Sequence, residues 1–356
     1  MRIQTLSFGL SYPTRTNLTL ISLLALSRSV FGTRFDRWTY GAPVSRETKQ
    51  RLEQATSAQW NCTSTTISPR ILGAETLLNF SGGFDSLAAL ALMGESTPLV
   101  SIDFGERFLR EREFYKEFNP AIVQTNAREF ETSWTFMGAG GLLMADYFSA
   151  GYMSFGSILE ASPWGFVSRK AFRGSHPIFK AVDVEETNPL AGITEFGTAK
   201  LAATAFPELV VASLESLADP HTEKYLRKSL LLSMVAEPSD LLSGIGGSPS
   251  SAKPMRFGEN FAADFLAPGL WMFSNKAEQW MSKPAGFDQW AKNMDLNFYM
   301  RELPNVMRHP VAEVDSAICK RKREFGMYSY SANDWDELRS VLRVLSFFHK
   351  FPGQTW

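Results

Sequence analysis

Short apolar runs and helix-like patterns alternate through the middle of the chain. The runs typical of buried strands lie at 76–80, 99–104, 121–125 and 152–158. The segments with helical spacing between them lie at 87–93, 107–118 and 141–150. Strands that alternate with helices favour a parallel sheet with helices on both faces. The pattern therefore predicts a Rossmann-like α/β fold.

The N-terminal part of the chain is patterned differently. It contains a short strand at 3–8, an apolar helix at 18–27 and a charged surface helix at 44–55. The apolar helix is too short to span a bilayer, so no membrane segment is predicted there. Residues 1–72 are therefore predicted to be an N-terminal extension that precedes the α/β domain.

The C-terminal part of the chain loses the alternation of strands and helices. The α/β domain is therefore predicted to cover 73–240. A stretch rich in Gly and Ser follows at 243–254, and Trp, Met and Phe then recur at helical spacing. Residues 241–356 are predicted to form a mostly helical C-terminal region.

Composition narrows the classes of function. The 356 residues are 44% hydrophobic and 21% charged, and their formal net charge is −1. Such a chain has no overall attraction to nucleic acid, and the basic run at 319–325 is interpreted first as a solvated helix face. Cys62 and Cys319 lie far apart, which excludes a disulfide framework and a cysteine-rich zinc site. This cysteine usage favours a reducing, cytoplasmic location.

The stretch SGGFDS, residues 81–86, follows the first strand of the α/β pattern. Its two glycines allow positive φ, and their N–H groups together with the start of a helix can bind an anion such as phosphate. A carboxylate beside phosphates is well placed to hold Mg²⁺. The competing interpretation is an ordinary turn, because neither a Walker A nor a GxGxxG pattern is present. The residues assigned to the nucleotide are Ser81, Gly82, Gly83, Asp85 and Ser86, with Asp85 as metal ligand and Asp85 and Ser86 also as catalytic residues.

Two later strands end in turns with similar properties. In open parallel sheets, ligands bind beyond the carboxyl ends of the strands. The second strand runs into Asp103-Phe104-Gly105, and the fourth runs into a segment that contains Gly156 and Glu160. These turns are predicted to add four cofactor-binding residues, Asp103, Phe104, Gly156 and Glu160.

A basic segment, SPWGFVSRKAFRGSHPIFKAVD, follows the fourth strand. Arg169 and Arg173 in this segment are predicted to be catalytic, because guanidinium groups can neutralise a carboxylate or a leaving pyrophosphate. The alternative is a solvated basic loop with no catalytic part. The sequence leaves both open.

The SGGFDS stretch resembles the SGGxDS loop of the PP-loop ATP pyrophosphatase superfamily. These enzymes cleave ATP between the α and β phosphates and place AMP on a carboxylate or carbonyl oxygen, from which a nitrogen or sulfur nucleophile displaces it. The resemblance implies an adenine nucleotide α-hydrolase-like fold, with ATP and Mg²⁺ bound at residues 81–86.

Within the superfamily, the chain most resembles 7-cyano-7-deazaguanine synthase over residues 75–235. The similar blocks are VSIDFGERFLRERE, TFMGAGGLLMADYFSAGYMSFGSILEA and NPLAGITEF. That family carries zinc-binding cysteines that this chain lacks, so no zinc is expected. Its glycine turn holds an arginine, whereas residues 138–141 here read GAGG. Its lysine after the proline-leucine turn is replaced here at or near Glu195, and Lys200 is the nearest lysine.

These features predict an ATP-dependent carbon–nitrogen ligase that adenylates a carboxylate and forms an amide or a nitrile. Its partners would be ATP and a carboxylate-bearing small molecule of the 7-deazaguanine type. The missing cysteines and the added terminal segments suggest a divergent member, in an antiphage defence system that modifies a protein or a nucleobase.

Two other functions stay open from the sequence. One is a tRNA-modifying PP-loop enzyme, lysidine-forming or thiolating, supported only by the basic run at 319–325. The other is a non-catalytic nucleotide-binding partner protein. Oligomers are compatible with either, and the sequence fixes neither the adenylated substrate nor its nucleophile.

Overall fold

The structure is a computed structural model that describes residues 7–15, 17–19, 36–68, 73–105, 108–126, 134–161, 166, 176–235, 254–304, 306 and 308–350. The chain divides into two compact units. The first unit is made of Met1–Ser81, Ser96–Phe155 and Gly174–Thr187. The second is made of Gly82–Glu95, Gly156–Arg173 and Asn188–Trp356. The domain boundaries predicted at 72 and 240 stay a prediction, because units grouped by contact need not be domains that fold alone.

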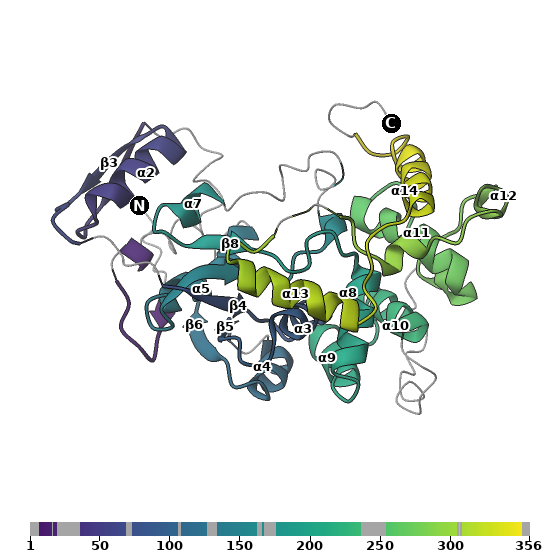
Figure 1. Ribbon diagram of the computed structural model, residues 1–356, viewed down its shortest axis with the longest axis horizontal. Coiled ribbons are helices and arrows are strands. Elements are labelled where there is room, and N and C mark those ends of the chain that lie inside the picture. Colours follow the sequence, from purple (N-terminus) through teal and green to yellow (C-terminus); the bar gives the residue numbers. More distant parts are fainter. Residues whose placement is uncertain are drawn as a thin grey trace. The chain divides into compact units, whose positions relative to one another are not determined.

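The first unit is built on a β-sheet. Among the described residues, six strands form this sheet in the order β1-β6-β5-β4-β7-β8, and all but the edge strand β1 run parallel (Figure 1). The strands are β1 (Phe8–Gly9), β4 (Glu75–Asn79), β5 (Leu99–Asp103), β6 (Ala121–Thr125), β7 (Ala150–Ser154) and β8 (Glu185–Thr187). Helices occur between successive parallel strands along the chain, so the predicted α/β class is confirmed.

The strand order has a consequence for ligand binding. Taken along the chain, the five parallel strands lie in space as third, second, first, fourth and fifth. In this order the connections leave in opposite directions from the neighbouring strands β4 and β7, which pair through Leu78 and Ser154. Ligands of doubly wound sheets bind beyond the carboxyl ends of the strands at this point. The chain segments that follow β4 and β7 are therefore the first place to look for a site.

Helix α5 (Ala139–Met144) packs on β4, β5 and β6 of the first unit. A Cβ on Gly140 would lie 2.8 Å from Cγ1 of Ile102, and a Cβ on Gly141 would lie 2.7 Å from Oδ1 of Asn79. The glycines of the 138–141 stretch thus serve close packing of a helix on the sheet. The helix ends at Met144, short of the predicted 141–150, since residues 145–149 form a turn that leads into β7.

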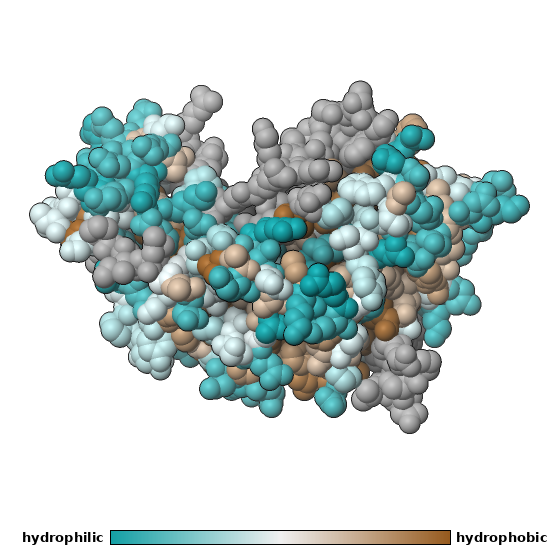
Figure 2. Space-filling model, viewed as in Figure 1, coloured by the Kyte–Doolittle hydropathy of each residue, from teal (hydrophilic) through white to brown (hydrophobic). Residues whose placement is uncertain are grey.

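The helix predicted at 44–55 is present as α2 (Arg46–Thr56), and its N-cap Ser45 accepts a hydrogen bond from the N–H of Thr48. It connects β2 (Arg37–Tyr40) and β3 (Gln59–Cys62), which pair with each other in parallel. Its outer face is charged, and hydrophilic surface covers this helix in Figure 2.

The N-terminal residues share a core with the sheet. Trp60 of β3 is 2% exposed and stacks on Trp38, with 5.3 Å between the ring centroids. It belongs to one apolar cluster with Leu52 of α2 and with Leu77 and Val100 of the sheet. Burial of large apolar side chains from both regions in one cluster stabilises them together. The predicted strand at 3–8 and helix at 18–27 lie mostly outside the described residues.

The second unit is mainly helical. Its longer helices are α3 (Phe84–Met93), α8 (Glu195–Ala205), α9 (Val210–Leu217), α10 (Glu223–Val235), α11 (Phe261–Phe273), α13 (Ala312–Glu324) and α14 (Ala332–Leu345), and α12 (Phe287–Ala291) is a short one. The described residues from 254 onward contain helices and turns but no strand of a sheet. Helix α8 packs against both α3 and α10.

The basic run of α13 has a partly structural use. Nη1 of Arg321 donates hydrogen bonds to the carbonyls of Leu92 and Met93, at 3.0 and 2.9 Å, and so satisfies the carboxyl end of α3. Lys322 is 7% exposed and forms an ion pair with Glu302. The interpretation of this run as a solvated face is therefore wrong for these two residues, although Lys320 and Arg323 are exposed.

Within the described residues, no helix is long and apolar enough to cross a membrane.

We expect Gly141→Ala to lower the free energy of unfolding by roughly 1–3 kcal/mol, because the new methyl group would overlap Asn79, Leu77 and Met153. Gly41→Ala is the matched control, since no heavy atom lies within 4 Å of a Cβ at that position. Urea unfolding of both variants measures the difference. Equal stability of the two variants would contradict close packing at Gly141.

Arg321→Ala is expected to destabilise the protein by about 1–2 kcal/mol, because the last carbonyls of α3 lose a charged donor. Arg323 lies two residues further along α13 and is exposed, so Arg323→Ala should change the stability by less than about 0.5 kcal/mol. Thermal unfolding checks both. A larger effect at Arg323 than at Arg321 would show that the helix end is not held in this way.

Candidate functional site

The SGGFDS stretch begins in the first unit with Ser81 and continues in the second unit, where Gly82 and Gly83 are buried. Gly82 has φ +80°, a backbone conformation that L side chains rarely adopt. Its carbonyl accepts a hydrogen bond from the hydroxyl of Ser213 on α9, at 2.6 Å. The turn therefore requires glycine at position 82, and the buried hydroxyl of Ser213 stabilises it.

Helix α3 begins directly after this turn. Its N-cap is Gly83, which has no side chain that could accept a hydrogen bond from the first N–H groups. These N–H groups and the helix dipole favour an anion at this end. A Cβ on Gly83 would lie 2.9 Å from Cδ1 of Leu217. A side chain there would have to displace Leu217, so the close packing as well as the turn calls for glycine.

The segment that follows β7 meets the glycine turn within the second unit. A Cβ on Gly156 would lie 2.9 Å from the carbonyl carbon and oxygen of Asp85. Only a residue without a side chain lets the two backbones approach so closely. The predicted cofactor residues Gly156 and Asp85 are therefore neighbours.

The Asp85 carboxylate is held by α8. The hydroxyl of Thr198 donates to Oδ1 of Asp85 at 2.6 Å, and Thr198 is fully buried. Asp85 itself is partly exposed, while the next residue, Ser86, is 6% exposed. A carboxylate that is fixed through one oxygen and still reaches solvent is suited to bind a cation that a ligand brings along.

Glu160 lies in the short helical turn η4 (Leu159–Ala161) and is 1% exposed. Its Oε1 accepts a hydrogen bond from the N–H of Glu195, at 2.7 Å. Its Oε2 is buried and has no hydrogen-bond partner among the described residues. Burial raises the pKa of Glu160 to about 8, and the Asp85 carboxylate adds to this, against the opposing effect of Arg227 and Lys228. Glu160 is therefore mainly a neutral acid at pH 7.

Two cations of α10 meet the first residue of α8. The Glu195 carboxylate forms an ion pair through Oε1 with Nζ of Lys228, at 2.7 Å, and through Oε2 with Nη1 of Arg227. Lys228 is 4% exposed and Glu195 is 3% exposed. The Lys228 ammonium also lies over the ring of Phe84, 4.9 Å from its centroid. Burial lowers the pKa of both cations, and the nearby carboxylates of Asp85 and Glu160 oppose the shift.

Sequence reasoning missed Arg227 and Lys228. A usable signal is present, because YLRKSLLLSMV places two adjacent cations directly before a mostly apolar run, and such charges are rarely buried without a partner. The lysine judged nearest to the expected place, Lys200, instead donates to the carbonyl of Gly326 at 2.9 Å.

The remaining predicted residues are distributed as follows. Asp103 is 4% exposed, accepts a hydrogen bond from the N–H of Gly105 at 2.8 Å, and pairs with Nη1 of Arg112 at 3.3 Å. With Phe104 these residues line a hollow of about 750 Å³ in the first unit. Arg169 and Arg173 lie outside the described residues, so their catalytic role stays a prediction.

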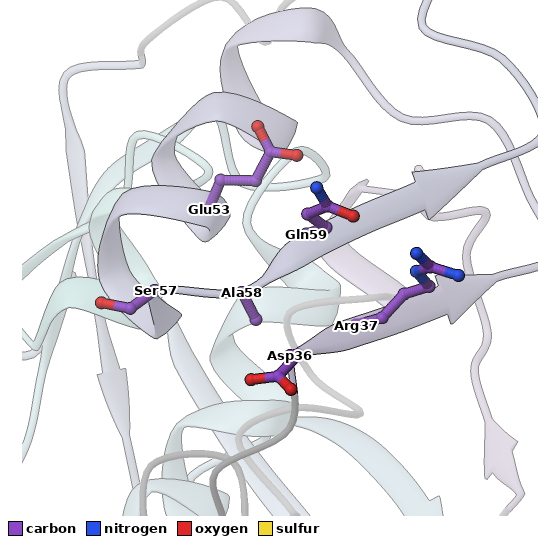
Figure 3. A pocket seen from close by; sticks show the side chains of 6 residues that line it. All are labelled: Asp36, Arg37, Glu53, Ser57, Ala58 and Gln59. Carbon is purple, nitrogen blue, oxygen red and sulfur yellow. The ribbon is translucent and has the colours of Figure 1, made fainter.

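A second hollow of about 720 Å³ in the first unit lies where α2 ends and β2 and β3 begin (Figure 3). Glu53, Gln59 and Arg37 line it and point away from the backbone as separate polar side chains (Figure 3). Glu53 already accepts a hydrogen bond from the N–H of Trp60, at 3.2 Å. This hollow contains no buried charge and no glycine turn, which makes it a weaker candidate than the region of Asp85.

Two further observations concern metals and sulfur. In the part of the chain that the structure describes, no three His, Cys, Asp or Glu side chains come together as a metal site. Both cysteines are unbridged and half-buried, and burial raises the pKa of Cys62. A raised pKa disfavours the thiolate at Cys62.

Comparisons of this chain with protein-family models, with curated proteins and with solved structures each give no match.

Glu160 should make the stability of the protein depend on pH. Its pKa is raised from 4.5 to about 8 on folding, so its contribution to stability is complete below about pH 4.5 and is lost as the pH rises through 8. From pH 6 to pH 9 we expect the wild type to lose about 2–3 kcal/mol relative to Glu160→Gln, which cannot ionise. Urea unfolding of both proteins at each pH gives this difference, in which all other titrating groups cancel. Parallel pH profiles would contradict a buried neutral acid at Glu160.

Proposed function

We propose that the chain is an ATP-dependent ligase whose glycine turn binds the phosphates of ATP, and that its fold is of the adenine nucleotide α-hydrolase-like class. The observation that carries the proposal is the contact of two glycine-dependent segments, at Gly82–Asp85 and Gly156. They follow the two strands between which the strand order reverses. Nucleotide sites of doubly wound sheets form from such segments.

The residues present fit ATP and Mg²⁺. A phosphate needs backbone donors without bulk, and the turn at Gly82 and Gly83 leads directly into the uncapped end of α3. Mg²⁺ prefers oxygen ligands and is usually shared between one or two carboxylates and the phosphates, so that Asp85 alone would be enough protein ligand. Bound there, Mg²⁺ would offset charge on the phosphate oxygens.

The residues of the chain would act mainly by position and charge. Thr198 orients Asp85, and Ser213 fixes the turn through the carbonyl of Gly82. The neutral Glu160 adds no negative charge beside a phosphate chain. Adenylation of a carboxylate makes pyrophosphate the leaving group, and its developing charge is stabilised by fixed donors and cations. An ionised carboxylate can attack the α phosphorus directly, so no general base is needed to deprotonate it.

The acyl acceptor and the carboxylate are part of the same proposal. A nitrogen nucleophile would displace AMP to give an amide, or a nitrile after dehydration. A 7-deazaguanine carboxylate is the proposed small-molecule substrate, and a protein amine or nucleobase is the proposed acceptor in a defence setting. Compared with a tRNA-modifying enzyme, this reading is favoured by the inward use of Arg321 and Lys322 in the basic run.

The test uses ATP labelled at the α phosphate with Mg²⁺, with and without 7-carboxy-7-deazaguanine. We expect labelled AMP and pyrophosphate, and a loss of roughly a hundredfold or more in rate for Asp85→Asn, which keeps the shape but not the charge. Asp288→Asn, at a side chain that is 81% exposed, is the matched control and should keep the rate.

Other products have distinct meanings. Labelled ADP in place of AMP would contradict cleavage between the α and β phosphates. ATP binding without turnover under any carboxylate would favour a non-catalytic nucleotide-binding protein. Turnover that requires tRNA would favour the tRNA-modifying enzyme.

A further inference from the structure

The buried ammonium of Lys228 shares its carboxylate partner. Glu195 gives one carboxylate oxygen to Lys228 and the other to Arg227, whose side chain is partly exposed. Arg227 has a further partner in Glu223, whose side chain is 40% exposed, with 3.0 Å between Nε and Oε1. Glu160 is mainly neutral at pH 7. Asp85 is therefore the next negative charge available to Lys228.

A buried cation whose only paired carboxylate is shared with a second cation is costly, so the position of Lys228 needs an explanation. If Asp85 binds Mg²⁺, as proposed above, its charge is no longer available to Lys228. The buried ammonium of Lys228 then has one oxygen of the Glu195 carboxylate as its partner, while Arg227 takes the other oxygen. An anionic ligand would supply the missing charge.

Lys228 lies near the N-terminal end of α3, where an anionic ligand is proposed to bind. Its ammonium is 4.9 Å from the ring centroid of Phe84, and Phe84 is the first residue of α3, directly after Gly83. The same helix end has no side-chain cap from Gly83, and the orientation of its N–H groups and its dipole favour anions. Two independent attractions for negative charge thus meet within one turn of helix.

We propose, on the basis of the function proposed above, that Lys228 is the residue that recognises the phosphate charge of a nucleotide at the glycine turn, and that Glu195 holds it in position. The lysine that the family resemblance leads us to expect after the proline-leucine turn is replaced here at or near Glu195. The Glu195 carboxylate binds an ammonium that comes from another helix, so the cation reaches the start of α8 by a different route. Lys200 does not serve this purpose, because its ammonium is bound to the carbonyl of Gly326.

The decisive variant is Lys228→Met, which removes the charge and keeps an unbranched side chain. It leaves Glu195 paired with Arg227, so no buried carboxylate is orphaned and folding is expected. Affinities for AMP, ADP and ATP, each with Mg²⁺, are measured by isothermal titration calorimetry. A charge that acts on the phosphates predicts a loss that grows with the ligand's charge: at least tenfold for ATP, several-fold for ADP and under threefold for AMP. Lys228→Arg should recover most of the ATP affinity.

The matched control is Lys322→Met. Lys322 is also a buried lysine of the second unit, 7% exposed and paired with one carboxylate, that of Glu302. Its replacement should lower the unfolding temperature by a similar amount and leave the affinities for all three nucleotides unchanged.

The outcomes separate the two proposals. A wild-type protein that binds none of the nucleotides would overturn the proposed function. A wild-type protein that binds ATP, with a Lys228→Met variant that binds all three nucleotides equally well or loses all three equally, would overturn the role of Lys228 and leave the function standing. Loss of ATP affinity in Lys322→Met to the same extent would also overturn it.

Discussion

The carboxylate of Glu195 binds two cations, the buried Lys228 and the partly buried Arg227. Glu195 is the first residue of α8, and this helix arranges the groups around the glycine turn. Its N–H donates to Glu160, and one helical turn later Thr198 donates to Asp85. The first turn of α8 therefore contacts both segments that follow the switch-point strands. A shift of this turn would move an acid, a carboxylate and two cations together, so the geometry of the candidate site is determined at one place.

Stability alone does not account for such a cluster. Removing charged groups from water costs several kcal/mol per ion, and apolar side chains of similar size often replace a buried ion pair without loss. Glu160 adds to the cost, because its Oε2 has no partner among the described residues. Polar groups that are kept at this cost, beside a turn that only glycine can form, are typical of a binding site. Arg321 has a structural role by contrast, because it donates hydrogen bonds to carbonyls at the opposite end of α3.

Much of the sheet could be predicted, because its strands are buried and show as uninterrupted apolar runs. The strand predicted at 121–125 matches β6, and those at 76–80 and 99–104 match β4 and β5 within a residue. The helix expected at 141–150 was extended too far, since the apolar composition continues through a turn that composition does not reveal. The glycines of the GAGG stretch bring a helix onto the sheet. Glycine alone does not distinguish a close ligand from a close neighbour.

The candidate site was predictable only where its chemistry is local in sequence. The turn at 81–86 shows its glycines, hydroxyls and carboxylate within six residues, and Gly156 and Glu160 follow a strand end as expected. The partners of Glu195 are 32 and 33 residues away, and no local pattern indicates that Arg227 and Lys228 turn toward it. For the same reason, the lack of a lysine near Glu195 in the sequence does not indicate that the ammonium of Lys228, from α10, lies there.

The charge state of Glu160 decides what kind of ligand the cluster suits. If Glu160 were ionised, it would join Asp85, Glu195 and Glu223 as a fourth carboxylate against two cations, and a phosphate chain would be repelled. As a neutral acid it leaves three carboxylates against two cations, and a divalent cation at Asp85 makes the sum positive. The desolvation that raises the pKa of Glu160 therefore favours an anionic ligand at the glycine turn. Burial of one acid, sharing of one carboxylate by two cations and a bare helix end all favour a ligand with several negative charges over a neutral one.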